Sequence, residues 1–511
     1  MAMNRKYWKG IDELSESPKF IESGEQEFSS ETSVEEFLGD DNLNESSTGR
    51  RDFLKFLGFS VAAATLAACE APVTKAIPYV NKPENVTPGM PTWYASTYYD
   101  GNSYASILVK TREGRPIYIK GNKDYGISNG ATNAQIIASV LGLYDSARLT
   151  RPQWHSKDGW NGIKFSEADK MIKKALKSSK KITLVSNTII SPSMMKAIKL
   201  FSLANGGTID EETGAVSNAG FEHIQYDAVS YAGMRAANKA SFGLTIREDD
   251  SQGIIPNYDF TKAKTIVSVG ADFLNSWLLP TQFSSQYAEG RNPDGDWMSK
   301  HFQFETVMSV TGSNADTRGM IKPSEEAAVL ASILKGLGGS TDVSTALTSD
   351  ETKKHVKSAV AALKASKKAS IVISGSNNTA VQMLTNKINS LLGAYTTTIN
   401  VNDPINLFKS EDSKMDKFVT SVIKGKGPDA VVFLGTNPVY TLPNGAEFGK
   451  KLSSIKHKIS LSSHADETAN LCDAIVPDHH ALESWMDFNP TASHYAIAQP
   501  SIRPLGNTSS A

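Results

Sequence analysis

Only two residues of this chain carry a thiol, and their number limits the chemistry that the chain can perform. The 511-residue sequence contains Cys69 and Cys472 and no other cysteine. A zinc knuckle, a covalently attached c-type haem and a four-cysteine iron–sulfur cluster each need more cysteines, or a closer pair of them. The sequence therefore excludes these three sites within this chain. If Cys69 is modified, no disulfide can form within the chain.

The residues around Cys69 form a pattern of export and lipidation. Arg50 and Arg51 are adjacent cations, and an uncharged run that covers residues 56–68 ends directly before Cys69. This run is shorter than the roughly 20 apolar residues that span a bilayer. The pattern resembles a twin-arginine export signal joined to a lipobox, in which the cysteine is acylated. We therefore predict a lipidated Cys69 and an export signal carried by Arg50, Arg51, Phe53, Leu54 and Lys55.

Residues 1–48, which precede the signal, form an acidic leader. No lysine or arginine occurs between Phe20 and Gly49, whereas acids are frequent there. Such a composition predicts a solvated, weakly structured segment. Before it, Tyr7, Trp8, Ile11 and Leu14 recur at helical spacing, so a short amphipathic helix is an alternative there.

Small polar residues follow three predicted buried strands, at the positions where open α/β folds bind ligands. The segments are GADF at 270–273, SGSNN at 374–378 and GTNP at 435–438. Their spacing matches neither the dinucleotide fingerprint nor the phosphate-binding P-loop. Ordinary strand-to-helix turns are the alternative explanation. By the argument from strand ends, the candidate cofactor-loop residues are Gly270, Asp272, Ser374, Gly375, Gly435 and Asn437.

The remaining titratable residues give weak signals. His479 and His480 follow Asp478 directly, but adjacent residues rarely point at one metal ion. Cys472 lies in an apolar run, where a thiol is usually buried and unreactive. Four acids near the end of the chain are expected to cap helices and face solvent rather than act as acid and base: Asp466, Glu467, Asp473 and Glu483. We predict no catalytic residue and no metal ligand.

The elements that would position the candidate loops alternate between strands and helices after residue 152. The β-rich run KKITLVSN at 180–187 is followed by a helical pattern, and AKTIVSVGADFLNSW at 263–277 is a second strand with its exit loop. Apolar strands that alternate with helices predict buried parallel sheets. Before residue 152 the pattern is β-rich. There the segment 104–122 predicts a hairpin with Gly114 at its turn, and a helix follows from residue 134.

The chain is thus predicted to be an α/β protein, with a small β-rich N-terminal domain followed by two doubly wound parallel-sheet domains. The predicted divisions are the leader 1–48, the signal with its lipobox 49–69, the β-rich domain 76–152, and α/β domains 153–345 and 346–511. The net charge of −1, with 40% hydrophobic and 21% charged residues, fits a globular chain and gives no argument for nucleic-acid binding.

Several segments resemble the molybdopterin oxidoreductase family. The stretches GRPIYIKGN and LYDSARLTRP are similar to the family's N-terminal domain. GADFL, GTNP and HADETANLCDAIVPD are similar to the segments that cradle its pterin dinucleotide, and this resemblance adds His464 and Asp466 to the vestigial cofactor-loop candidates. The leader and the twin-arginine signal resemble those of its relatives in alternative complex III, a quinol-oxidising membrane complex. The resemblance covers most of residues 80–505.

The sequence departs from the family at the positions that carry redox chemistry. Many members place four iron–sulfur cysteines in the β-rich domain, where this chain has Thr97, Tyr98 and Tyr99. Active members also supply a cysteine, selenocysteine, serine or aspartate to molybdenum. Ser217 or Asp227 could serve, but no motif selects either. The resemblance therefore implies a retained fold with no cofactor in this chain and with molybdopterin absent.

The resemblance also implies a place in a larger assembly. We expect a scaffold part of the iron–sulfur subunit of alternative complex III, supporting electron transfer from membrane quinol to cytochrome c or a terminal oxidase. Its [4Fe–4S] and [3Fe–4S] clusters are expected in a C-terminal continuation beyond Ala511. The implied partners are multihaem and monohaem cytochrome c subunits, integral membrane quinol-binding subunits and a terminal oxidase. The implied location is the periplasmic side of the bacterial inner membrane, with a lipid anchor.

Two other functions stay open. One is a periplasmic molybdenum-dependent reductase of a small oxyanion or sulfur compound. The other is a free-standing solute-binding lipoprotein built from α/β domains.

Overall fold

The computed structural model describes residues 87, 89–209, 216–244 and 253–510. The chain divides into two units, Met1–Asn81 and Lys82–Ala511, and every described residue belongs to the second unit. The predicted leader, the export signal and Cys69 lie outside the described residues. Among the described residues, no helix combines the length and the apolar character needed to cross a bilayer.

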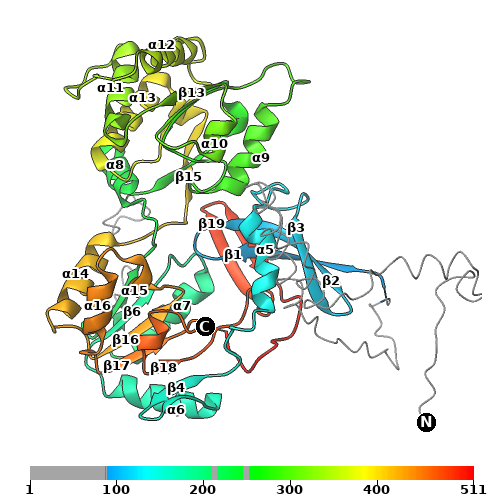
Figure 1. Cartoon of the computed structure of the whole chain (residues 1–511), viewed down its shortest axis with the longest axis vertical. Coiled ribbons are helices and arrows are strands. Elements are labelled where there is room, and N and C mark those ends of the chain that lie inside the picture. The colour runs from blue at the N-terminus through cyan, green and yellow to red at the C-terminus, as the bar shows by residue number, and fades with distance from the viewer. Residues whose placement is uncertain (1–86, 88, 210–215, 245–252, 511) are drawn as a thin grey trace, which may run out of the picture. The chain divides into compact units, whose positions relative to one another are not determined.

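A three-stranded antiparallel sheet begins the described chain (Figure 1). Its hairpin turns at Gly114, whose φ of 77° is favourable only for glycine, as the sequence predicts. Ile107, Val109 and Ile119 point to one face and pack on Ile136 of the helix that follows. The elements are β1 (Thr92–Tyr99), β2 (Tyr104–Arg112), β3 (Arg115–Gly121) and α5 (Ala134–Leu143).

The largest sheet has seven strands in the order β5-β4-β18-β17-β16-β6-β9, and its strands β9, β6, β16, β17 and β18 are parallel. Its strands are β4 (Gln153–Ser156), β5 (Gly159–Gly162), β6 (Ile182–Ser186), β9 (Phe221–Gln225), β16 (Ala430–Leu434), β17 (His457–Ser460) and β18 (Ala474–Ile475). Its helices are α6 (Phe165–Lys177), α7 (Pro192–Ala204), α14 (Asp412–Ile423), α15 (Pro438–Thr441) and α16 (Gly445–Leu452). Figure 1 shows α14 and α16 on one side of this sheet and α7 on the other.

A second parallel sheet has four strands in the order β13-β12-β11-β14. Alternate residues of its central strand enter different cores, because successive side chains point to opposite faces. Ile266 packs in a cluster with Phe283 of α9, whereas Val267 packs with Ile333 of α11. The elements are β11 (Thr265–Val269), β12 (Lys300–Glu305), β13 (Thr317–Met320), β14 (Ser370–Ser374), α8 (Ala232–Phe242), α9 (Pro280–Gly290), α10 (Val310–Ser313), α11 (Glu326–Gly336), α12 (Asp350–Ala365) and α13 (Thr379–Leu392).

Two smaller sheets complete the described part. One has the order β10-β15-β19-β20 and the other is a two-stranded antiparallel sheet. Their strands are β10 (Ile255–Tyr258), β15 (Ile399–Ile405), β19 (Met486–Thr491), β20 (His494–Ala498), β7 (Thr208–Ile209) and β8 (Val216–Ser217).

The two parallel sheets give the α/β fold that the sequence predicts. However, the seven-stranded sheet joins strands from before residue 226 with strands from after residue 429. The predicted boundary between residues 345 and 346 therefore does not separate the two sheets. The four-stranded sheet is an insertion between β9 and β16.

Candidate functional site

Both parallel sheets contain a point where the order of the strands reverses. In the four-stranded sheet β11 lies between β12 and β14, and in the seven-stranded sheet β16 lies between β17 and β6. At such a point the loops after two neighbouring strands run to opposite sides, which leaves room for a ligand at the carboxyl ends. The predicted cofactor loops follow β11, β14 and β16, so these two points are the candidate sites.

The loops after β11 and β16 share one local arrangement of a glycine and a hydrogen-bonded side chain. Gly270 and Gly435 follow these strands with φ of 67° and 61°. Two residues later, Asp272 Oδ1 accepts hydrogen bonds from Thr311 N (3.0 Å) and Thr311 Oγ1 (2.6 Å). In the same way, Asn437 Oδ1 accepts from Thr468 N (3.1 Å) and Thr468 Oγ1 (2.7 Å). Each loop is thus fixed by one threonine from a distant segment.

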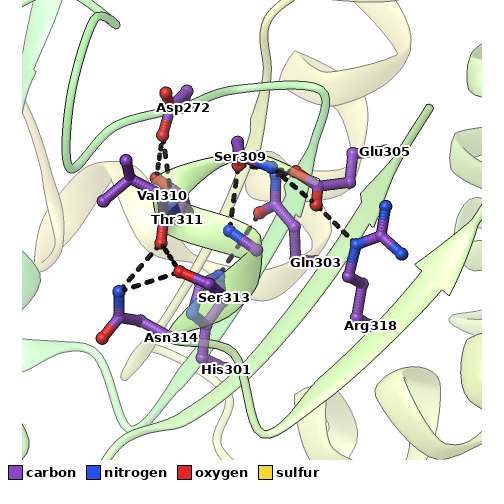
Figure 2. Close-up of polar contacts among 11 residues, drawn as sticks. Asp272, His301, Gln303, Glu305, Ser309, Val310, Thr311, Ser313, Asn314 and Arg318 are labelled. Atoms are coloured by element: carbon purple, nitrogen blue, oxygen red, sulfur yellow. Dashed lines mark hydrogen bonds and ion pairs between the residues drawn. The ribbon is translucent and has the colours of Figure 1, made fainter. Parts of the chain in front are cut away.

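At the four-stranded sheet, the hydrogen bonds between Asp272 and Thr311 belong to a larger polar network (Figure 2). Glu305, at the end of β12, accepts hydrogen bonds from Ser309 Oγ (2.6 Å), Gln303 Nε2 (3.1 Å) and Arg318 Nε (2.6 Å). Ser309 Oγ in turn accepts from Gly312 N (2.9 Å) and so caps the short helix α10. The polar groups at the carboxyl end of β12 are therefore hydrogen-bonded to one another.

Two titratable groups of this network are held in one protonation state. Burial alone would raise the pKa of Glu305, but hydrogen bonds from Ser309, Arg318 and Gln303 outweigh it and leave the pKa below its usual range. Burial lowers the pKa of His301 to about 4. Near neutral pH, Glu305 is a carboxylate and His301 is an uncharged imidazole.

The predicted residues Gly270 and Gly375 do meet, but they close the space between them. A Cβ atom on Gly375 would lie 2.2 Å from the carbonyl oxygen of Gly270. Ser374 is buried, and its Oγ accepts from Ser376 N (3.2 Å). Asn377 Oδ1 accepts from Gly233 N (2.8 Å) of α8, which holds the SGSNN loop in place. The loops after β11 and β14 therefore pack on each other and on α8.

At the seven-stranded sheet, the equivalent point is hollow. Asn187 follows β6 as Gly375 follows β14, and its side chain lies against both Gly101 and Gly435. Two hollows of about 280 and 180 Å³ lie here, and both are lined by Asp100, Asn187 and Gly435. Asn437 lines the smaller one. Sequence reasoning missed Asn187, although its position directly after an apolar strand was a usable signal.

The hollows are acidic. Their charged lining consists of Asp100, Asp227 and Asp478, and no lysine or arginine is among the described residues that line them. Asp227, which the sequence left open as a metal ligand, accepts from Thr188 N (2.8 Å), Thr188 Oγ1 (2.6 Å) and Ser410 N (3.1 Å). Burial nevertheless raises the pKa of Asp227.

The start of α7, which faces the larger hollow, is already occupied by a carboxylate. A helix N-terminus can bind phosphate through its free N–H groups. Here Asp487 accepts from Ser193 N (3.2 Å) and Ser193 Oγ (2.7 Å), and also from the Oγ of the N-cap residue Ser191. Asp487 therefore satisfies the donors that a phosphate would need.

A phosphate-bearing pterin dinucleotide does not fit these residues. Its negative charge would meet the acids of the hollows, and Asp487 holds the helix end that would compensate it. The larger hollow, at about 280 Å³, also falls below the roughly 300–1,000 Å³ of typical ligand pockets. Among the described residues, no group of three or more His, Cys, Asp or Glu side chains could hold a metal ion.

The predicted residues His464 and Asp466 lie outside the residues that line the two hollows. The Nε2 atom of His464 is 3.3 Å from Asp145 Oδ2. Asp466 Oδ1 accepts from Ala469 N (2.8 Å), the first residue of the short 3-10 helix Ala469–Leu471, although the N-cap residue of that helix is Thr468. The Asp466 side chain thus bonds within its own loop, whereas His464 contacts a residue 319 positions earlier in the chain.

Glu483 corrects the prediction that the acids near the end of the chain face solvent. Its side chain is fully buried and pairs with Arg148, whose Nη1 donates to Glu483 Oε1 (2.9 Å). Burial alone would raise the pKa of Glu483, but hydrogen bonds from Arg148, Leu505 N and His480 N outweigh it and lower the pKa. Because Arg148 lies 335 positions earlier in the chain, no local pattern could reveal the pair.

Cys472 behaves as expected for a structural cysteine. It is buried and not disulfide-bonded, and its Sγ donates to the carbonyl oxygen of Thr468 (3.3 Å). Burial raises the pKa of the Cys472 thiol, which keeps it protonated and unreactive.

Comparison with known proteins decides the family. The family model of the molybdopterin oxidoreductases matches residues 148–507. The chain belongs to this family. The family's fold accounts for the two parallel sheets and for the candidate loops at their carboxyl ends.

Two individual proteins show how far the likeness extends. The chain is 26% identical over 514 residues to the menaquinone reductase, molybdopterin-binding-like subunit of Nitratidesulfovibrio vulgaris; the match covers 90% of this chain and 70% of that protein. The solved structure of acetylene hydratase from Pelobacter acetylenicus matches with a TM-score of 0.61 at 10% identity, and covers 82% of this chain and 67% of the hydratase chain. The second likeness shows the fold alone.

Proposed function

We propose that this chain is a scaffold subunit of a quinone-linked respiratory complex and carries no pterin cofactor of its own. The observation that carries this proposal is the acidic hollow at the carboxyl end of β16, where Asp487 already caps α7. A relative that is named as a molybdopterin-binding-like subunit of a menaquinone reductase supports the link to quinone chemistry.

We further propose that the complex is alternative complex III or a close relative of it. In this role the chain positions an iron–sulfur module against multihaem and monohaem cytochrome c subunits and integral membrane quinol-binding subunits, and a terminal oxidase can accept the electrons. The support is the sequence pattern of the leader and of the signal at residues 49–69. The same pattern supports export by the twin-arginine route and a lipid anchor at Cys69 on the periplasmic side.

A molybdenum-dependent reductase is the second candidate function, and family membership favours it. In that case a pterin would have to displace the hydrogen bonds between Asp487 and Ser193. Asp227 would have to give up its bonds to Thr188 and Ser410 to serve as a metal ligand.

Metal analysis of the protein purified from its native membranes in mild detergent separates the two functions. The scaffold proposal expects no molybdenum above background, together with haem-containing subunits that co-purify with the chain. One molybdenum per chain would establish the reductase instead. A chain that elutes alone, without haem, would refute membership of a respiratory complex.

A further inference from the structure

One face of the three-stranded sheet is not covered by α5 and carries aromatic and basic side chains together. Trp93 is 38% exposed and Tyr118 is 43% exposed, and their rings meet edge to face with centroids 6.4 Å apart. The Nζ atoms of Lys110 and Lys120 lie 5.7 and 4.3 Å from the centre of the Trp93 ring. We call Trp93, Lys110, Tyr118 and Lys120 the Trp93 face.

Strand register explains why these side chains gather. Trp93 is opposite Lys110 in the β1–β2 pair, and Lys110 is opposite Tyr118 in the β2–β3 pair. Directly paired residues of antiparallel strands point to the same side of the sheet. The opposite side packs on α5 through Ile107, Val109 and Ile119, so the Trp93 face is the side left exposed.

The positive charge extends along the hairpin. Arg112 and Arg115 are paired beside the turn and are exposed, and Glu113 is the one acid between them. The face and the turn thus combine four cations with one anion. A surface of this kind is complementary to a negatively charged partner.

The position of the face in the chain indicates which partner this is. Cys69, the predicted site of lipidation, is separated from β1 by the 22 residues from Glu70 to Pro91. Fully extended, such a segment spans at most about 75 Å, so an anchor at Cys69 would keep β1 near the membrane. β1, with Trp93 as its second residue, is the first described element after the anchor.

We propose that the Trp93 face rests on an anionic lipid surface. The ring systems of Trp93 and Tyr118 enter the headgroup region, where amphipathic aromatic side chains are enriched. Lys110 and Lys120 extend along the ring of Trp93 and place their ammonium groups among the lipid phosphates. This inference rests on the proposed lipid anchor, because the anchor would hold the protein close to the membrane and the Trp93 face would set which side of the protein turns towards it.

Vesicle flotation of the full-length chain tests the face separately from the anchor. The protein carries Cys69→Ser, so that no acyl chain can attach, and the vesicles are phosphatidylcholine with or without phosphatidylglycerol. We expect binding to the anionic vesicles only. Binding should fall sharply between about 0.1 M and 1 M salt, where the Debye length drops from about 10 to 3 Å.

Charge removal on the face should weaken this binding. In the Cys69→Ser background, Lys110→Gln with Lys120→Gln should reduce the affinity about 30-fold, because each lysine near an anionic surface contributes roughly a factor of five. The matched control is Lys181→Gln with Lys417→Gln, which removes two exposed lysines that line a hollow elsewhere on the chain. This control should bind as the parent does.

The aromatic part has its own control. Trp93→Ser should weaken binding further, whereas Trp485→Ser, at a tryptophan that is 67% exposed, should not. Quenching of tryptophan fluorescence by brominated lipids should disappear in Trp93→Ser alone. If Trp93→Ser fails to fold, as judged by its unfolding midpoint, the lysine variants still decide the question.

Equal affinities of the two lysine double variants would overturn the proposal, and so would a parent that ignores anionic vesicles. A different result would assign the face to a protein: the parent retains a protein partner but does not bind vesicles, and the Lys110→Gln/Lys120→Gln variant loses that partner. The mass of the mature wild-type N-terminus tests the anchor independently. An unmodified Cys69 would remove the anchor while the flotation result still stands.

Discussion

The carboxyl ends of the two parallel sheets begin from the same local geometry and end in different structures. After β11 and β16, a glycine with positive φ leads to an oxygen, from Asp272 or Asn437, that binds one threonine. The neighbouring strands then differ. Gly375 packs its backbone on Gly270, whereas Asn187 places a side chain against Gly435 and lines two hollows.

This difference shows that the same strand arrangement does not by itself provide a binding site. At the four-stranded sheet, backbone contact and the network around Glu305 fill the position. At the seven-stranded sheet the space persists, but its acids and Asp487 make it unsuited to a phosphate-bearing ligand. Four sets of variants test the comparison, and they are ordered by the size of the expected effect.

The buried ion pairs beside the two sheets should respond most strongly. Arg148→Met leaves Glu483 as a buried, unpaired charge and should lower the free energy of unfolding by about 3–5 kcal/mol. Arg318→Met should cost about 1–2 kcal/mol, because Glu305 keeps its bonds from Ser309 and Gln303. Denaturant titration at neutral pH measures both.

Lys353→Met, which breaks an exposed pair with Asp350 on α12, is the control and should leave the midpoint unchanged. Equal losses for Arg148→Met and Arg318→Met would contradict the claim that the first pair is the more deeply buried.

Alanine at one glycine beside each strand-order reversal, Gly375 or Gly435, should separate steric from conformational cost. Gly375→Ala should cost about 3 kcal/mol, because its Cβ meets the backbone of Gly270, which cannot move freely. Gly435→Ala should cost about 1–2 kcal/mol, mostly from its positive φ, because the nearest atoms belong to the side chain of Asn187.

Gly114→Ala controls for the conformational part, since this turn glycine has positive φ and open space around it. If Gly375→Ala proves milder than Gly114→Ala, the loops after β11 and β14 are not in close contact.

One histidine in each sheet, the buried His301 and the half-buried His223, should make the protein sensitive to acid. Burial lowers the pKa of His301 on β12 and of His223 on β9 to about 4, against about 6.5 in an unfolded chain. As the pH falls below 6.5 the unfolded state takes up these protons first, so stability is full above pH 6.5 and declines towards pH 4. Each histidine should contribute a loss of about 2–3 kcal/mol.

Unfolding titrations at several pH values measure this slope. His301→Gln and His223→Gln should each flatten it, and the double variant should flatten it further. A slope that neither substitution changes would mean that both imidazoles are protonated as easily in the folded as in the unfolded chain.

The hydrogen bonds from Thr311 to Asp272 and from Thr468 to Asn437 should give the smallest difference in stability between variants. Thr311→Val removes a donor to the carboxylate Asp272 and should cost about 2 kcal/mol, whereas Thr468→Val removes a donor to the amide Asn437 and should cost about 1 kcal/mol. Thr311→Ser and Thr468→Ser keep the hydroxyl and serve as controls. Thermal unfolding shows which valine variant loses more stability. A larger loss in Thr468→Val than in Thr311→Val would contradict the expectation that the hydrogen bond to the carboxylate is the stronger one.

Short-range patterns allowed much of the fold to be predicted from the sequence. The apolar runs of β6, β11 and β14 each form a fully buried parallel strand. Ser191 caps α7 by accepting from Met194 N (3.1 Å). These features depend on residues a few positions apart, so they can be predicted from short stretches of the sequence.

The candidate site could be located from the sequence but not described. Gly270, Gly375, Gly435 and Asn437 do lie at the carboxyl ends of parallel strands. Their partners come from distant segments, such as Thr311 for Asp272 and Thr468 for Asn437. The role of Asp487 at the start of α7 likewise joins residues almost 300 positions apart.

By itself, the sequence determined the strands, the hairpin at Gly114 and the cap of α7, and it excluded a zinc knuckle, a c-type haem and a four-cysteine iron–sulfur cluster within this chain, because each depends on residue type or near neighbours. Only the tertiary structure decided that β16 joins the sheet of β6 across the inserted four-stranded sheet. It also decided that Glu483 is buried on Arg148 and that one strand-order reversal closes while the other stays hollow. These outcomes depend on which distant side chains meet, and the burial that results sets their energies.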